Sequence, residues 1–416
     1  MRKLFQIVAF ICLALAPAVH ANDSINADCF QVSPVEAFQN LYFTPESRCQ
    51  PFQSIDNSTH KLFSTRFCKA TNELSVLTSE AEQCETLIPS ILYQTTLSIP
   101  TVGAITLTKD ALIGILGQTS SSWTLTIRKI SALDVVHTVS IPMPITITHW
   151  SLTDTAGYFV IFLAIPNSNG NSNIFTINEA LFLVDKQTGA LRWTTPFVYY
   201  QYNVQSQFSV GARGITQLPN GKFFIAWQRN KLQMKSIFYR IFGPNSGDTG
   251  TEVAFKESTG PESQYELNSV GVVNGNHYIF YTEHDSNLPE AFYFWRNSKT
   301  PIEIEKRTYI SSPKGTTVYP YFLSAHLLQT EKGDRLAVLY RMADLFGVEL
   351  LNYRAIDDTG TTCSYKYGTQ ISSSNVEIST VNGANGEFYF MVGLTQARNL
   401  VYAIGSFDYT DLCGSC

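Results

Sequence analysis

The chain has 416 residues, of which 15% are charged and 13% are aromatic, and its formal net charge at pH 7 is −5. Its basic residues form no run and no basic domain, which argues against a nucleic-acid-binding protein. After the N-terminal apolar stretch no segment reaches 18 apolar residues, so we expect no membrane-spanning segment. The abundance of Tyr, Phe, Thr, Val and Ile favours strands over helices.

The start of the chain has the three parts of a secretory signal peptide. The charged part is Arg2-Lys3, and an apolar run follows over residues 4–16. Residues 18–21, AVHA, place small side chains at a cleavage site. We therefore expect residues 1–21 to be removed and the protein to be secreted, or periplasmic in a bacterium. A retained signal anchor is the alternative.

Cysteines predict a disulfide-stapled segment at the start of the mature chain. Four of them lie within residues 22–95, which we expect to form a small Cys-rich segment. Seven cysteines follow the signal peptide, so at least one is free or pairs with another chain, which leaves a disulfide-linked oligomer open. The tail 413–416, Cys-x-x-Cys, favours a structural pair over a redox pair, because no helix follows it. The disulfide candidates are Cys29, Cys49, Cys68, Cys84, Cys363, Cys413 and Cys416, and the glycosylation candidates are Asn22 and Asn57.

From residue 96 to 412 the chain repeats one pattern: an apolar strand, a polar turn and a second strand of alternating apolar residues. The clearest copy is GITQLPNGKFFIAWQ at 214–228. Such turns are typical of hairpins, because glycine adopts a positive φ without steric cost. The predicted hairpins lie at 104–118, 149–164, 214–228, 269–283, 324–341 and 376–393.

A third strand follows most of these hairpins, as in SIFYRIF at 236–242. Residues 180–193 are expected to supply a third strand, a turn and a fourth strand. Each unit thus predicts a four-stranded antiparallel sheet of roughly 50 residues, and about six such units in series predict an all-β fold, a β-propeller. Two packed sheets are the main alternative. Further third strands are expected at 291–297, 348–356 and 400–407.

Polar turns that contain Asp and Gly join the third and fourth strands. An Asp side chain accepts backbone N–H groups within such a turn, and Gly takes the position with positive φ, so we interpret these residues as structural. The turn residues are Asp185 and Gly189, Asp248 and Gly250, and Asp358 and Gly360.

Two of these turns resemble the repeats of known propeller families. S-x-D-x-G at 246–250 resembles the start of the Asp-box of sialidase-type propellers, although the closing Thr-Trp is absent. LVDKQTG at 183–189 resembles the turn of pyrroloquinoline-quinone-type propeller repeats. The likeness runs from about residue 100 to 410 and, since its motifs are short, implies a fold rather than an activity.

The sialidase resemblance also raises a divergent glycoside hydrolase as an alternative function. Sialidases need an arginine cluster that binds a carboxylate, a Tyr nucleophile paired with Glu, and an Asp acid. Their Phe-Arg-Ile-Pro signature is missing here, since YRIF at 239–242 lies mid-chain and lacks the Pro. The candidate arginines are Arg213, Arg240, Arg296, Arg341 and Arg354.

Glu283 and Asp285 are the candidate metal ligands. Alternate residues of a strand share a face, so these two carboxylates converge while His284 points away. Oxygen ligands favour Ca²⁺ over zinc. A solvated polar loop is the alternative, and no other cofactor is expected.

Two Tyr-rich stretches, FVYYQYN at 197–203 and TTVYPYF at 316–322, are predicted to be loops between sheets. Aromatic faces suit sugars and peptide side chains, and connecting loops on a rigid scaffold often carry function. Core packing is the alternative. The ligand-binding candidates are Tyr199, Tyr200, Tyr202, Tyr319, Tyr321 and Arg213.

No complete catalytic constellation is present, so we do not expect an enzyme. The leading hypothesis is an extracellular binding protein whose propeller loops bind a glycan or a cell-surface protein. The alternatives are the sialidase-like hydrolase and a structural matrix protein cross-linked through an unpaired cysteine.

Overall fold

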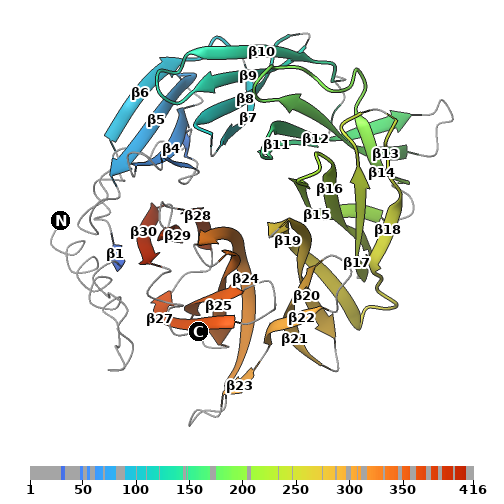
Figure 1. The fold of residues 1–416 in the computed structure, drawn as a ribbon, viewed down its shortest axis with the longest axis vertical. Coiled ribbons are helices and arrows are strands. Elements are labelled where there is room, and N and C mark those ends of the chain that lie inside the picture. Colours follow the sequence, from blue (N-terminus) through green and yellow to red (C-terminus); the bar gives the residue numbers. More distant parts are fainter. Residues whose placement is uncertain are drawn as a thin grey trace. The chain divides into compact units, whose positions relative to one another are not determined.

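The computed structural model describes an all-β chain (Figure 1). The chain divides into two compact units. It describes residues 30–32, 47–49, 54–56, 61–68, 71–80 and, with short gaps, 90–408, and side chains mainly between residues 92 and 285. One unit is Leu97–Lys306, and the other combines Met1–Thr96 with Arg307–Cys416. Within the described residues, no helix combines the length and apolarity that crossing a bilayer demands.

The unit Leu97–Lys306 contains four antiparallel four-stranded sheets, in each of which the strands are hydrogen-bonded in chain order. The first sheet has β7 (Thr101–Leu107), β8 (Leu112–Gln118), β9 (Trp123–Lys129) and β10 (Val135–Ile141). The second has β11 (His149–Asp154), β12 (Tyr158–Ser168), β13 (Phe175–Asp185) and β14 (Phe197–Asn203). The third has β15 (Phe208–Gln217), β16 (Phe223–Lys231), β17 (Met234–Phe242) and β18 (Glu252–Lys256). The fourth has β19 (Ser263–Val273), β20 (Asn276–Asp285), β21 (Leu288–Arg296) and β22 (Ile302–Lys306).

The other unit contains three sheets, of which one joins the two ends of the chain. The first has β2 (Ser47–Cys49), β3 (Ser54–Asp56), β4 (Lys61–Cys68), β5 (Glu73–Glu80) and β6 (Ser90–Thr96). The second has β23 (Thr308–Ile310), β24 (Thr316–Thr330), β25 (Gly333–Asp344), β26 (Glu349–Ile356) and β27 (Thr362–Ile371). In the third, β1 (Phe30–Val32) pairs with β30 (Asn399–Asp408), which continues into β29 (Glu387–Gln396) and β28 (Val376–Asn382).

Antiparallel sheets of strands taken in chain order are the blades of a β-propeller. All six predicted hairpins are confirmed as pairs of consecutive antiparallel strands, namely β7 with β8, β11 with β12, β15 with β16, β19 with β20, β24 with β25 and β28 with β29. The described residues form seven sheets, since strands β2–β6 of the N-terminal segment add one to the six predicted units, an addition that the prediction of about six units left open. The N-terminal segment therefore supplies one sheet and one strand of another. Its predicted separation from the propeller at residue 95 stays a prediction.

The predicted loops at 197–203 and 316–322 are wrong, because both stretches are strands. The first is β14, the fourth strand of its sheet, and the second is the start of β24. Their Val and Tyr residues fit a pleated, half-buried surface, and this preference outweighs the absence of a strict hydrophobic alternation.

The fourth strand predicted within residues 180–193 is also wrong. Beyond the turn, Leu191 makes an isolated bridge to Val184, and the fourth strand begins only at Phe197. Trp193 leaves the sheet because its ring is buried in the core between the second and third sheets.

The second strand of a sheet in this unit is buried on both faces. In β12, Phe159 and Ile161 pack with strands of the first sheet, whereas Val160 and Phe162 pack with strands of the third. Successive side chains of a strand point to opposite faces, so a strand between two neighbouring sheets is a continuous apolar run rather than an alternating one. The run YFVIFLA of β12 and the run FFIAW of β16 both have this composition.

The turn between β17 and β18 has the positive-φ glycine that its sequence predicts, whereas its Asp side chain forms an ion pair. Gly250 has a φ of +64°, and a Cβ there would overlap the carbonyl oxygen of Ile241. The carboxylate of Asp248 pairs with Lys222 Nζ at 3.0 Å. The turn therefore depends on a residue without a side chain.

The turn after β13 uses the Asp side chain as a local acceptor. Asp185 Oδ1 accepts the backbone N–H groups of Gln187 and Thr188 at 3.0 and 2.9 Å. Gly189 follows with a φ of +70°. These bonds satisfy N–H groups that the end of the strand would leave unpaired.

Gly250→Ala is expected to lower the free energy of unfolding by more than about 2 kcal/mol. A positive φ costs an L-residue about 1–2 kcal/mol, and the overlap with Ile241 adds to this cost. Gly221→Ala is the matched control, because Gly221 has a φ of +80° but no atom within 4 Å of an added Cβ. Urea unfolding of both variants measures the difference, and equal losses would show that the overlap contributes nothing.

Candidate functional site

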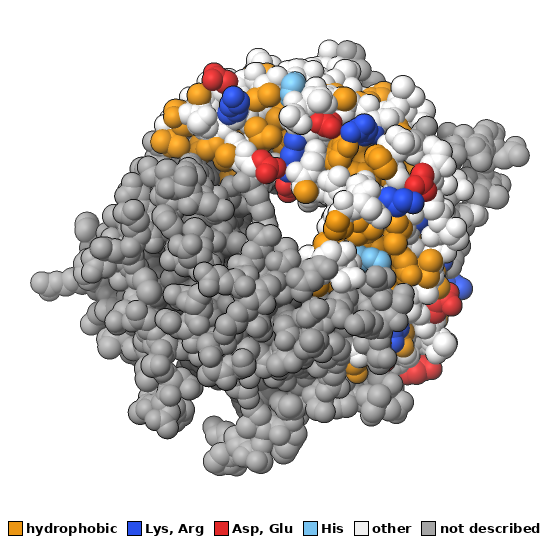
Figure 2. All heavy atoms as spheres, viewed as in Figure 1, with side chains coloured by type: hydrophobic (Ala, Val, Ile, Leu, Met, Phe, Trp, Pro, Cys, Tyr) orange, Lys and Arg blue, Asp and Glu red, His pale blue; other side chains and the backbone are white. Residues whose placement is uncertain are grey.

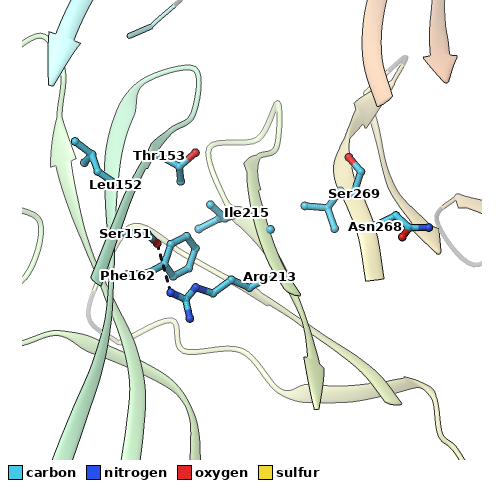
Figure 3. Close-up of a pocket in the computed structure, with 10 residues that line it drawn as sticks. Ser151, Leu152, Thr153, Phe162, Arg213, Ile215, Asn268 and Ser269 are labelled. Carbon is cyan, nitrogen blue, oxygen red and sulfur yellow. Dashed lines mark hydrogen bonds between the residues drawn. The ribbon is translucent and has the colours of Figure 1, made fainter. Parts of the chain in front are cut away.

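A cavity of about 340 Å³ lies in the unit Leu97–Lys306, between strands of its second, third and fourth sheets. Its walls come from β11, β15 and β19, each the first strand of a sheet, together with one aromatic residue of β12 (Figure 3). Hydroxyl, amide and guanidinium groups therefore alternate with apolar side chains on the cavity surface. The lining residues are Ser151, Leu152, Thr153, Phe162, Arg213, Gly214, Ile215, Asn268, Ser269 and Val270.

Irregularities in the strands place two of these polar residues at the cavity. The register of β15 against β16 shifts between Val210 and Arg213. The register of β19 against β20 shifts between Leu267 and Ser269, which leaves Asn268 outside the regular pairing. A bulge of this kind redirects a side chain that strict alternation would send to the other face.

Arg213 is held on three sides. Its Nη1 donates to Glu179 Oε2 at 3.2 Å, and its Nη2 donates to Ser151 Oγ at 3.4 Å. The guanidinium carbon lies 4.9 Å from the centre of the Phe162 ring, within the range of a cation–π contact. Figure 3 shows the guanidinium beside Ser151 and Phe162. The cation at the cavity therefore has a fixed position before any ligand binds.

Glu179 is the buried partner of this cation. It lies on β13, 3% exposed, and it also accepts a hydrogen bond from the Tyr199 hydroxyl at 3.4 Å. Burial raises the pKa of Glu179, and the charges of Arg213 and His149 and the Tyr199 bond only partly offset that effect. The sequence predictions missed Glu179, although a carboxylate inside the apolar run TINEALFLVD is a signal of a buried ion pair.

A bulge also separates the predicted tyrosines. In β14, Tyr200 pairs with Glu179 and Val198 pairs with Ala180. Tyr199 lies between these two pairs and is the residue that the bulge leaves out of the regular pairing. Its side chain is fully buried, and burial raises its pKa. Tyr200 and Tyr202 are half-buried and stack on each other, with ring centres 5.7 Å apart. The three tyrosines therefore do not form one exposed surface.

Several other predicted residues have no described side chain. Tyr319 and Tyr321 lie on β24, and their side chains are outside the described residues. Of the candidate arginines whose side chains are described, Arg213 lines the cavity and Arg240 does not. The remaining predicted residues whose positions or side chains lie outside the description are Arg296, Arg341, Arg354, Asp358, Gly360, Asn22, Asn57, Cys29, Cys49, Cys68, Cys84, Cys363, Cys413 and Cys416.

The arrangement is suited to binding a polar ligand. The described part offers one fixed cation, three hydroxyl groups and one amide around the cavity. A Tyr–Glu pair exists, Tyr199 with Glu179, but both side chains are buried and neither lines the cavity. A buried Tyr with a raised pKa is a poor nucleophile.

Comparison with known proteins bears on the fold alone. No protein-family model and no curated protein sequence matches the chain. Among solved structures, the Dos1 propeller is 10% identical, with 83% of this chain and 75% of that chain covered and a TM-score of 0.43. A periplasmic gluconolactonase from Pseudomonas aeruginosa is 14% identical, with 84% and 96% covered and a TM-score of 0.44.

A longer protein is also similar. Prolyl oligopeptidase B from Galerina marginata is 11% identical, with 98% of this chain covered and a TM-score of 0.48. The chain spans 52% of that enzyme. At such identities no activity follows for this chain, and the propeller fold rests on the strand order described above.

Charged side chains of both signs are interspersed on the described surface, and several of them form ion pairs. Figure 2 shows acidic and basic side chains interspersed on this face rather than gathered into one patch. Arg229 pairs with Glu252 at 2.9 Å, and Lys235 pairs with Glu266 at 3.3 Å.

Of the two predicted metal ligands, Glu283 and Asp285, only Glu283 has a described side chain. His284 Nε2 lies 3.3 Å from Glu266 Oε2. The side chain of Asp285 is outside the described residues, and the residues described contain no group of three or more His, Cys, Asp or Glu that could hold a metal. The hydrogen bond from His284, together with Lys235, lowers the pKa of Glu266 to about 2. A calcium site at Glu283 and Asp285 stays a prediction.

The Glu266 pKa predicts an acid-sensitive contribution to stability. A carboxyl group whose pKa is lower in the folded than in the unfolded state stabilises the fold at pH values above its ordinary pKa of 4.5. This contribution is lost as the pH falls from 4.5 toward 2. We therefore expect the wild type to lose more stability between pH 5 and pH 3 than Glu266→Gln, measured by chemical unfolding. The exposed Glu257→Gln is the control, and a wild-type-like pH dependence in Glu266→Gln would contradict the prediction.

Proposed function

We propose that the protein is exported from the cytoplasm and binds a glycan in the cavity between β11, β15 and β19. The observation that carries this proposal is a polar cavity of about 340 Å³ with one immobilised guanidinium. Small-molecule sites commonly measure about 300–1,000 Å³ and place a few polar groups among apolar ones. The N-terminal signal sequence supports export.

The lining matches the chemistry of a sugar. Hydroxyl groups of a sugar both donate and accept hydrogen bonds, and the lining presents Ser151, Thr153 and Ser269 to them. Asn268 is oriented by the bond from its Nδ2 to Thr282 Oγ1 at 2.7 Å. Leu152 and the other apolar side chains suit the C–H faces of a sugar ring. Groups fixed before binding lose little entropy when the ligand arrives.

The other hypotheses draw less support from the geometry. A sialidase-like hydrolase needs a nucleophile that reaches the substrate, and Tyr199 lies outside the cavity. Contact with a cell-surface protein through Tyr200 and Tyr202 is less favoured, because both side chains are half-buried and offer a partner only part of their surface. A cross-linked matrix protein rests on cysteines outside the described side chains. Glycan binding without catalysis is therefore the function that the cavity supports best.

The full chain is expected to bind saturably to one class of sugar on a glycan array. The double substitution Ser151→Ala with Thr153→Ala should weaken this binding about tenfold, because each lost hydrogen bond contributes about 0.5–1.5 kcal/mol. Gln201→Ala is the control, since Gln201 is an exposed residue of β14 outside the cavity. Titration of the captured glycan against each purified variant measures the affinities.

Two outcomes would count against the proposal. If no sugar on the array is bound, glycan binding is contradicted. If the double variant binds with unchanged affinity, the cavity is not the binding site. Repeating the array with a chelator tests the calcium prediction separately, since loss of binding would require Glu283 and Asp285 or another cation site.

A further inference from the structure

Arg213 faces two ways, toward the cavity and toward a buried carboxylate. No acidic residue lines the cavity within the described part, and Arg213 is the one charged residue there. Glu179 pairs with Arg213 but is not among the lining residues, and its own side chain is 4% exposed. A ligand in the cavity therefore meets the guanidinium rather than the buried carboxylate.

The bond from Arg213 to Ser151 is the one that a ligand replaces most easily. At 3.4 Å it is longer than the usual 2.7–3.2 Å for an N–H···O bond, and its acceptor is a neutral hydroxyl. A carboxylate on the same guanidinium forms shorter, charge-assisted and often bidentate bonds. Nη2 is thus a donor whose present partner is weak.

A second anion on Arg213 would leave Glu179 poorly compensated. The other titratable groups near Glu179 are Tyr199 on β14, which donates a hydrogen bond, and His149 on β11, which acts through its charge. Tyr200 and Tyr202 also lie close enough for Glu179 to raise their pKa values. A buried carboxylate that shares its cation with a second anion is therefore favoured in its neutral, protonated form.

We propose that the ligand of this cavity carries a carboxylate, which pairs with Arg213, and that Glu179 takes up one proton as this carboxylate binds. The proposal rests on the glycan-binding function above and narrows it to acidic sugars. The proton comes from hydronium or the acid form of the buffer, whose bond to it breaks as one O–H bond forms at Glu179, and the ligand itself binds without covalent change. The bound state then holds one cation, one anion and one neutral acid.

Calorimetric titration of the full chain with D-glucuronate tests the proposal, with D-glucose as the neutral match. Glucuronate should bind more tightly than glucose, and its affinity should rise as the pH is lowered from 8 to 6, by up to tenfold per unit. Titrations in buffers of different ionisation enthalpy should give an uptake of up to one proton per bound glucuronate.

Substitutions distinguish the role of the Glu179 carboxylate from that of the ligand carboxylate. Glu179→Gln should abolish the proton uptake and the pH dependence and should bind glucuronate more tightly than the wild type at pH 8. Arg213→Met should lose glucuronate binding. The double variant Glu179→Gln with Arg213→Met is the folding control, because it contains no unpaired buried charge. This variant should fold and should also fail to bind glucuronate. His149→Gln should keep the pH dependence, which excludes the imidazole as the group that takes up the proton.

The proposal is overturned if glucose binds as tightly as glucuronate, if Glu179→Gln keeps the wild-type pH dependence, or if no acidic probe binds. Binding of neutral glycans without glucuronate would keep the proposed function and remove this inference. Titration with D-gluconate, an open-chain acid without a sugar ring, tests the carboxylate site independently of the glycan function. If gluconate binds with proton uptake while the glycan array stays silent, the carboxylate site stands and the glycan function fails.

Discussion

Burial of the second strand on both faces is the constraint on which the unit Leu97–Lys306 depends. Each pair of neighbouring sheets shares one hydrophobic cluster. One face of β12 packs in the cluster shared with the first sheet, and its other face packs in the cluster shared with the third sheet. In the same way, β16 contributes to the cluster shared with the second sheet and to the cluster shared with the fourth sheet. Aromatic rings fill these layers, as where Phe197 and Phe242 stack with centres 4.4 Å apart. The runs Phe159–Ala164 of β12 and Phe223–Trp227 of β16 are buried and entirely apolar. The polar residues of the cavity come from the first strands β11, β15 and β19.

Two polar residues of the cavity, Arg213 and Asn268, lie where strand alternation breaks. Register shifts precede Arg213 in β15 and enclose Asn268 in β19, and a third shift in β14 turns Tyr199 inward to Glu179. A regular strand would present one polar and one apolar face. Each bulge moves one side chain out of this pattern, so a mostly apolar layer can carry a small polar site without losing its packing.

The repeats were predictable from the sequence because a hairpin is a local structure. Asn-Gly turns and apolar runs are adjacent in the chain, and all six predicted hairpins are present. The site was not predictable in the same way. Glu179 meets Arg213 across two sheets, and nothing local distinguishes Tyr199, which is buried by a bulge, from the half-buried Tyr200 beside it. Arg213 was predicted as a ligand contact from its charge, but its partners depend on how neighbouring sheets pack.

The buried pair of Glu179 and Arg213 has to be explained by something other than stability. Desolvation of two charges offsets most of their attraction, and apolar residues of similar volume often serve a fold as well or better. Here the carboxylate is buried and does not line the cavity, whereas the cation lines it together with three hydroxyl groups. The pair fixes the guanidinium in one orientation and keeps the isolated cavity close to neutral. An arrangement that holds a cation ready, and can release it by protonating one buried carboxyl group, fits a binding site better than it fits a structural core.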